Sequence, residues 1–68
     1  MDFIKFDKVL ITSGYYKNNV GVVDTVTDEC YHVIINSTGL HTSCVIFPKN
    51  NFEAIKVDKN FIPKNHHL

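Results

Sequence analysis

Short runs of alternating residues, rich in β-branched side chains and separated by turn residues, make up most of this sequence. The first run, Lys8–Thr12, places Val9 and Ile11 on one face of an extended strand, because side chains two positions apart point to the same side. Further runs of this kind cover Val20–Thr27, Cys30–Ile35, Leu40–Phe47 and Phe52–Val57. No segment has the i, i+3, i+4, i+7 apolar spacing of a long helix. The pattern therefore predicts an all-β fold.

Turn residues separate the expected strands at Asp28–Glu29, Asn36–Gly39 and Pro48–Asn51. Five short strands spaced about 8–12 residues apart are typical of a small barrel or sandwich. Closing the sheet also removes the edges through which a small protein would aggregate. We expect a five-stranded barrel over residues 1–58, followed by a partly disordered C-terminal tail over residues 59–68 that is mobile beyond Ile62. Gly21 predicts a bulge or a close backbone approach near the start of the second strand.

The expected core takes one apolar face from each strand. Its members are Val9, Ile11, Val23, Val26, Val33, Ile35, Val45, Phe47, Phe52 and Ile55. Phe3 and Phe6 are expected to close one end of the barrel. A chain of 68 residues buries only about 60% of its unfolded surface, and such a core supplies roughly 3–5 kcal/mol. A homodimer formed through an edge strand is therefore a second expected source of stability.

The charge composition argues against a strong nucleic-acid binder. The chain has seven lysines, no arginine and seven acidic residues, and its formal net charge is zero. Nucleic-acid binding depends on neutralising phosphates, and arginine makes the bidentate contacts to phosphate and guanine. The use of lysine without arginine, together with many Asn and Ile residues, indicates an AT-rich genome such as that of a low-GC bacterium or its phage.

The N-terminal stretch MDFIKF mixes charged and apolar residues and is not followed by the apolar run of a signal peptide. No window reaches the about 18 consecutive apolar residues of a transmembrane helix. We therefore expect a cytoplasmic protein that has no contact with a membrane.

The stretch FDKVLITSGYYKNNVGVVDTV resembles a KOW motif, the strand–loop–strand signature of certain SH3-like barrels. The matching positions are Asp7, Val9, Ile11, Gly14, Lys17, Gly21 and Val23. Phe6 replaces the usual leading glycine, and Asn18 replaces the middle glycine of the loop; asparagine tolerates a left-handed backbone better than most residues. The resemblance implies a KOW-type SH3-like barrel. It leaves the function open, because this fold hosts RNA binders, transcription-elongation factors and protein-binding modules.

The loop between Gly14 and Gly21 is the main candidate binding site, because the resemblance implies that this loop contacts RNA or protein. Its candidate contact residues are Tyr15, Tyr16, Lys17, Asn18 and Asn19. Tyrosine stacks on bases while lysine and asparagine meet phosphates or base edges, and tyrosine is also enriched at protein-binding hot spots. The alternative is a plain linker, in which one tyrosine caps the core and the other packs over lysine stems.

Two cysteines and two histidines, the ligand set of structural zinc sites, occur at Cys30, His32, His41 and Cys44. A turn at Asn36–Gly39 places Cys44 opposite His32, and His41 then lies about 10 Å along the sheet. Zinc needs all four ligands about 2.0–2.3 Å from one point, so we expect no metal site. Cys30 and His32 share a strand face, but a thiol nucleophile also needs an orienting group and an oxyanion pocket. We expect two small thiols without chemistry.

Enzyme, nucleic-acid binder and protein-binding module are the classes to compare. Scattered carboxylates and a barrel filled by its own side chains offer no catalytic arrangement, so we expect no enzyme and no cofactor. Our hypothesis is a stand-alone docking module, an adaptor or inhibitor encoded by a phage, that acts on a host replication or transcription protein. The alternative is an RNA- or single-stranded-DNA-binding protein that uses the same loop. It predicts one basic face formed by Lys8, Lys17, Lys49 and Lys56.

Overall fold

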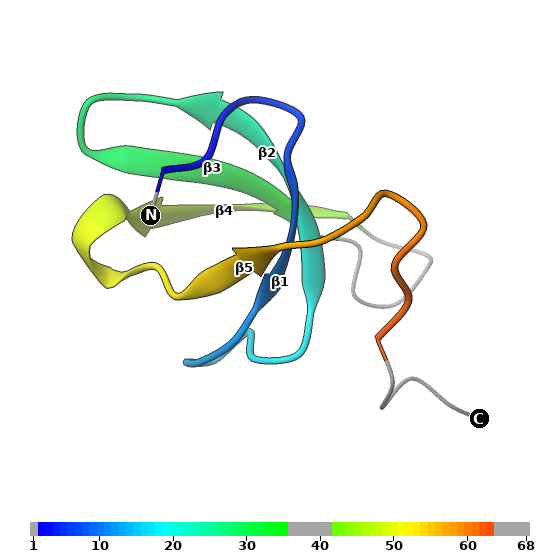
Figure 1. Ribbon diagram of the computed structural model, residues 1–68. Coiled ribbons are helices and arrows are strands. Elements are labelled where there is room, and N and C mark those ends of the chain that lie inside the picture. Colours follow the sequence, from blue (N-terminus) through cyan, green and yellow to red (C-terminus); the bar gives the residue numbers. More distant parts are fainter. Residues whose placement is uncertain (1, 36–41, 64–68) are drawn as a thin grey trace.

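The computed structural model describes residues 2–35 and 42–63, which form a single five-stranded sheet (Figure 1). The strands are β1 (Lys8–Ile11), β2 (Val20–Val26), β3 (Cys30–Ile35), β4 (Ser43–Pro48) and β5 (Ala54–Lys56), and a 3₁₀ turn, η1 (Lys49–Asn51), links the last two. The strand order is β4-β3-β2-β1-β5, with every neighbouring pair antiparallel. The prediction of an all-β fold is confirmed. In the described ranges no pairing joins β4 to β5, so the sheet is open at these two strands.

Most of the expected strands and turns lie where the pattern placed them. The strand starting at Lys8 and the strand Cys30–Ile35 begin as predicted, whereas β4 begins at Ser43 instead of Leu40. The predicted turn at Asn36–Gly39 lies outside the described residues. The turn after β2 is closed by Cys30, whose amide donates to the Thr27 hydroxyl over 3.0 Å.

One face of the sheet carries the core. Its buried apolar residues are Phe3, Val9, Ile11, Val23, Tyr31, Val33 and Ile35. Strict alternation along β3 places Tyr31 in phase with Val33 and Ile35, so the buried Tyr31 is a core residue that the prediction missed. Val45, Phe47, Phe52 and Ala54 are half-buried against this cluster. Among the two phenylalanines expected to close one end, Phe3 is buried as predicted.

Three core predictions are wrong. Ile55 is 46% exposed because it pairs with Leu10, and its neighbour Ala54, opposite Ile11, packs against the core instead. Val26 pairs with the buried Tyr31 but is 39% exposed, because it is the last residue of β2. Phe6 is 77% exposed, because the backbone turns sharply at this residue, as described below.

Gly21 lies where two strands approach closely, as predicted. A Cβ atom at this position would lie 2.5 Å from Val33 Cγ1 and 3.0 Å from the Ile34 carbonyl oxygen. The bulge itself lies further along, because the register of β2 against β3 shifts between Val23 and Thr25. One extra residue in β2 thereby turns the following side chains to the other face.

The first part of the expected tail contacts the sheet. The Lys8 ammonium donates to the carbonyl oxygens of Lys59 over 2.7 Å and Phe61 over 2.9 Å. Residues 64–68 lie outside the described part of the chain. No helix in the described ranges is long and apolar enough to cross a membrane.

Candidate functional site

Backbone hydrogen bonds fix the loop that joins β1 to β2. The Asn18 amide donates to the Ile11 carbonyl over 2.8 Å, and the Ile11 amide donates to the Asn19 carbonyl over 2.9 Å. Within the loop, the Tyr16 carbonyl accepts both the amide and the side-chain Nδ2 of Asn19, at 3.0 and 3.1 Å. Hydrogen bonds within the chain therefore define the conformation of this loop without a partner.

Two residues of the loop have a left-handed backbone. Gly14 has a φ of +87° and Asn18 a φ of +74°. Asparagine is among the few non-glycine residues that adopt this region readily. The expectation that Asn18 preserves the loop geometry is confirmed.

The two tyrosines of the loop have different environments. Tyr16 is half-buried, and its ring centroid lies 5.9 Å from that of Phe47 in an edge-to-face contact. Tyr15 is 91% exposed, and its ring stands edge-to-face on Tyr16 with centroids 4.9 Å apart. Phe47 in turn contacts Phe52 at 4.6 Å. A row of aromatic rings therefore supports the exposed Tyr15 from the core.

A second contact ties this loop to the segment before β5. The Thr12 amide donates to the Glu53 carbonyl over 2.9 Å, and the Ser13 hydroxyl donates to the Glu53 carboxylate over 2.7 Å. These bonds attach the start of the loop to the residue before β5, on the side of β1 that is opposite β2.

The lysines that the nucleic-acid alternative requires do not gather on one face. Lys56 pairs with the Asp7 carboxylate over 3.3 Å, and the Lys49 ammonium lies 5.4 Å from the Tyr31 ring centroid. Lys56 lies opposite Val9 in the ladder, so it projects to the other face from Lys8, because successive residues alternate. Lys17 lies alone on the β1–β2 loop, and it is exposed.

The predicted placement of the cysteine and histidine residues is wrong by two positions. Cys44 pairs with Ile34, and His32 pairs with Ile46. Ser43 pairs with Ile35. His41 lies outside the described residues, and the described ones contain no group of three or more His, Cys, Asp or Glu side chains able to hold a metal. Both thiols are free, with Cys44 exposed and Cys30 half-buried.

The turn before β1 is a feature that the sequence prediction missed. The Asp7 amide donates to the Ile4 carbonyl over 3.1 Å, and the Phe6 amide donates to the Val23 carbonyl over 2.7 Å. Phe6 has a φ of +78°, and Lys5 before it does not have a positive φ. This is the pattern of a type II turn, whose third residue needs a φ near about +80° and is usually glycine. The signal was present in the sequence, because Phe6 stands where the KOW motif carries glycine.

Asp7 holds this turn from the inside. Its carboxylate accepts the Ile4 amide over 2.9 Å and lies 3.3 Å from the Lys56 ammonium. The hydrogen bond from the Ile4 amide lowers the pKa of Asp7 from its ordinary value of 3.8; burial opposes this shift, and the nearby Lys56 ammonium lowers the pKa further.

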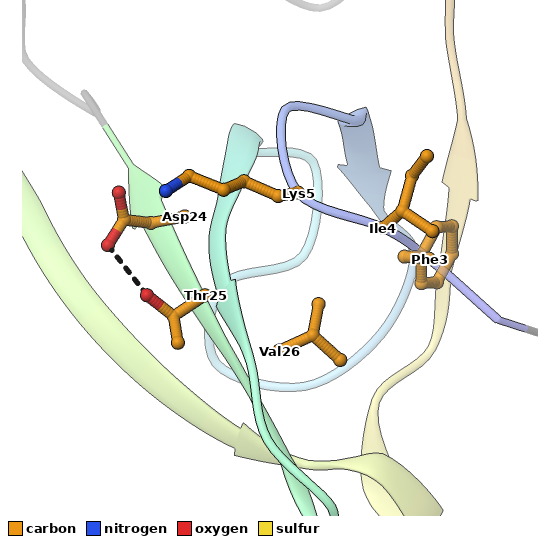
Figure 2. A pocket seen from close by; sticks show the side chains of 6 residues that line it. All are labelled: Phe3, Ile4, Lys5, Asp24, Thr25 and Val26. Atoms are coloured by element: carbon orange, nitrogen blue, oxygen red, sulfur yellow. Dashed lines mark hydrogen bonds between the residues drawn. The ribbon is translucent and has the colours of Figure 1, made fainter.

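A shallow hollow of about 350 Å³ lies beside the turn. It is lined by Phe3, Ile4, Lys5, Asp24, Thr25 and Val26. Figure 2 shows Lys5, Asp24 and Thr25 on one side of the hollow and Ile4 with Phe3 on the other. The Asp24 carboxylate accepts a hydrogen bond from the Thr25 hydroxyl over 3.1 Å. The hollow therefore has an apolar side and a charged side.

Comparison of the chain with protein-family models, with curated proteins and with solved structures gives no match in any of the three.

Proposed function

We propose that this protein is a non-enzymatic binding module, an adaptor or inhibitor, that docks on a protein partner through the β1–β2 loop. The observation that carries the proposal is Tyr15, whose ring is 91% exposed on a loop that hydrogen bonds hold in place. A rigid aromatic side chain offers a large contact area at a small entropic cost. A preordered loop adds to this advantage, because binding then orders little further chain.

We further propose that the open sheet is a KOW-type SH3-like barrel. Three observations support this assignment: the strand order, the 3₁₀ turn between β4 and β5, and a positive φ at both Phe6 and Asn18, where the motif carries glycine. In this proposal the protein is cytoplasmic and phage-encoded and acts on a host replication or transcription protein, in keeping with its arginine-free composition.

RNA or single-stranded DNA is the weaker alternative as a partner. The formal net charge is zero, and Lys8, Lys49 and Lys56 already have contacts within the chain. Stacking of one exposed ring contributes only about 1–3 kcal/mol. The phosphate contacts that normally dominate such binding would have to come from Lys17 and residues beside it.

The test places a photoreactive phenylalanine analogue at Tyr15, with the same analogue at the exposed Asn50 in η1 as a control. A protein crosslinked only from position 15 is then purified, and its affinity is measured for the wild type and for Tyr15→Ala. We expect Tyr15→Ala to weaken binding at least about 30-fold, the loss typical of a hot-spot residue, with an unchanged urea midpoint. Equal affinities would overturn the proposal.

Tyr15→Ala is preferred to a double substitution, because Tyr16 packs on Phe47 and its removal would also weaken the fold. A parallel fluorescence-anisotropy titration uses short single-stranded and duplex DNA and RNA at two salt concentrations. Micromolar binding that weakens with salt and is lost in Tyr15→Ala would instead favour the nucleic-acid alternative.

A further inference from the structure

The turn before β1 combines backbone strain with solvent exposure. A left-handed backbone costs a non-glycine residue about 1–2 kcal/mol, and Phe6 adopts it with 77% of its surface exposed. Glycine at this position would fold at least as well. Strained residues of this kind persist where surrounding bonds hold them, and they cluster at functional sites.

Apolar side chains surround this residue at one end of the sheet. Ile4 is 66% exposed and Val26 is 39% exposed, and both line the hollow together with Phe3. The Lys5 ammonium lies 5.3 Å from the Phe6 ring centroid, and the Lys5 side chain also lines the hollow, so Lys5 links the Phe6 ring to the hollow. An exposed aromatic ring and the hollow therefore lie at the same end of the sheet.

The charges around the hollow are of both signs. Lys5 and Asp24 line it on the same side (Figure 2), and in the described part of the chain they form no ion pair with each other, since Lys56–Asp7 is the pair found there. Because both signs lie on one surface, a second copy turned about a two-fold axis can set its Asp24 against Lys5 of the first copy and its Lys5 against Asp24. A surface that carries exposed apolar side chains and both charges can pair with a copy of itself, as an isologous interface requires.

From this complementarity we propose that two copies of this chain associate through a surface formed by Ile4, Lys5, Phe6, Asp24 and Val26. The formal net charge of zero leaves no overall repulsion between copies. A small core also gains stability from association. This surface lies at the opposite end of β1 from the Tyr15 loop (Figure 1), so the dimer leaves the proposed docking loop accessible.

Sedimentation equilibrium over micromolar to millimolar protein concentrations tests the proposal. We expect a monomer–dimer equilibrium that is weakened about tenfold or more by Lys5→Glu and by Asp24→Lys, because each places like charges together. The combined variant Lys5→Glu/Asp24→Lys restores the wild-type dissociation constant. Lys17→Glu is the matched control, because it changes net charge equally at the other end of β1 and should leave association unchanged.

Phe6→Gly separates association from folding. It removes the ring and also relieves the strained backbone, so the monomer stays folded while dimerisation weakens at least about 30-fold. Tyr15→Ala should leave dimerisation unchanged, which keeps this proposal independent of the docking function. A monomer at every concentration would overturn the proposal. So would a dimer that is insensitive to Lys5, Phe6 and Asp24, because it would place the contact at an edge strand instead.

Discussion

The turn before β1 and the β1–β2 loop each need one residue with a positive φ angle. Phe6 fills this position in the first, and Asn18 fills it in the second. Their φ angles are +78° and +74°, and both stand where the KOW motif carries glycine. Asparagine adopts this region with little strain, whereas a bulky residue is a genuine outlier there. The β1–β2 loop therefore meets its geometric requirement with a tolerated residue, and the turn before β1 does not. This difference supports the proposal that the aromatic ring at position 6 serves association rather than folding.

The two turns also differ in what holds them. Backbone bonds and the Asn19 side chain close the β1–β2 loop. The turn before β1 depends in addition on the Asp7 carboxylate, which accepts the Ile4 amide and pairs with Lys56. The turn before β1 is therefore linked to the titration of Asp7, whereas the bonds that hold Asn18 and Asn19 come from the backbone and an amide side chain.

The largest expected loss of stability comes from substituting Gly21, where there is no space for a side chain. Gly14 differs, because it has space but needs a positive φ angle. In Gly21→Ala the new Cβ atom would lie 2.5 Å from Val33 Cγ1, and this overpacking should lower the free energy of unfolding by about 2–3 kcal/mol. Gly14→Ala is the control: its Cβ atom would meet nothing within 4 Å but its φ is +87°, so a loss of about 1 kcal/mol is expected. Equal losses in urea unfolding would contradict this distinction.

A smaller effect is expected from acid, and it should fall on only one of the two turns. Because the pKa of Asp7 is lower in the folded protein than its ordinary 3.8, its carboxylate stabilises the fold above that value. This stabilisation is lost as the pH falls through the lower, folded pKa. Asp7→Asn should therefore reduce stability at neutral pH and flatten its dependence on acid. NMR amide shifts near Phe6 should move with the Asp7 titration, whereas those near Asn18 should not.

The smallest effect is expected at Asn18. Asn18→Gly keeps the left-handed backbone accessible and removes a side chain without a required contact, so the free energy of unfolding should change by less than about 0.5 kcal/mol. The measurement is urea denaturation beside the wild type. A gain above about 1 kcal/mol would mean that Asn18 is as strained as Phe6, and the contrast between the two turns would be lost.

Much of the fold was predictable, because alternation fixes both the strand and its buried face. Val9, Ile11, Val33 and Ile35 follow directly from period-two patterns and are buried. Alternation along β3 also predicts that Tyr31 is buried, although hydrophobicity alone favoured the aliphatic residues of the same strand, Val33 and Ile35. A local motif singled out Tyr15 and Tyr16, and the linker alternative anticipated that one of them packs on the core; which of the two rings packs was not predictable.

The remaining errors arise where the sequence does not show the register. Beyond the bulge between Val23 and Thr25, Val26 pairs with the buried Tyr31, but it is the last residue of β2 and stays 39% exposed, and the hydrophobic pattern does not show where the strand ends. In β5 both Ala54 and Ile55 are apolar, and only pairing with β1 decides which faces inward. The hollow beside Ile4 brings together residues far apart in the chain, so no local pattern indicates it. The one local sign was the missing glycine at Phe6.

Phe6→Gly in equilibrium urea denaturation tests the central claim most directly, with Phe6→Ala as its control. Alanine removes the ring and keeps the strained φ, whereas glycine removes both. If Phe6 is retained at the expense of folding, Phe6→Gly should raise the free energy of unfolding by about 0.5–1 kcal/mol, and Phe6→Ala should give no gain. A loss of stability in Phe6→Gly would show that the ring serves the fold itself and would contradict the account.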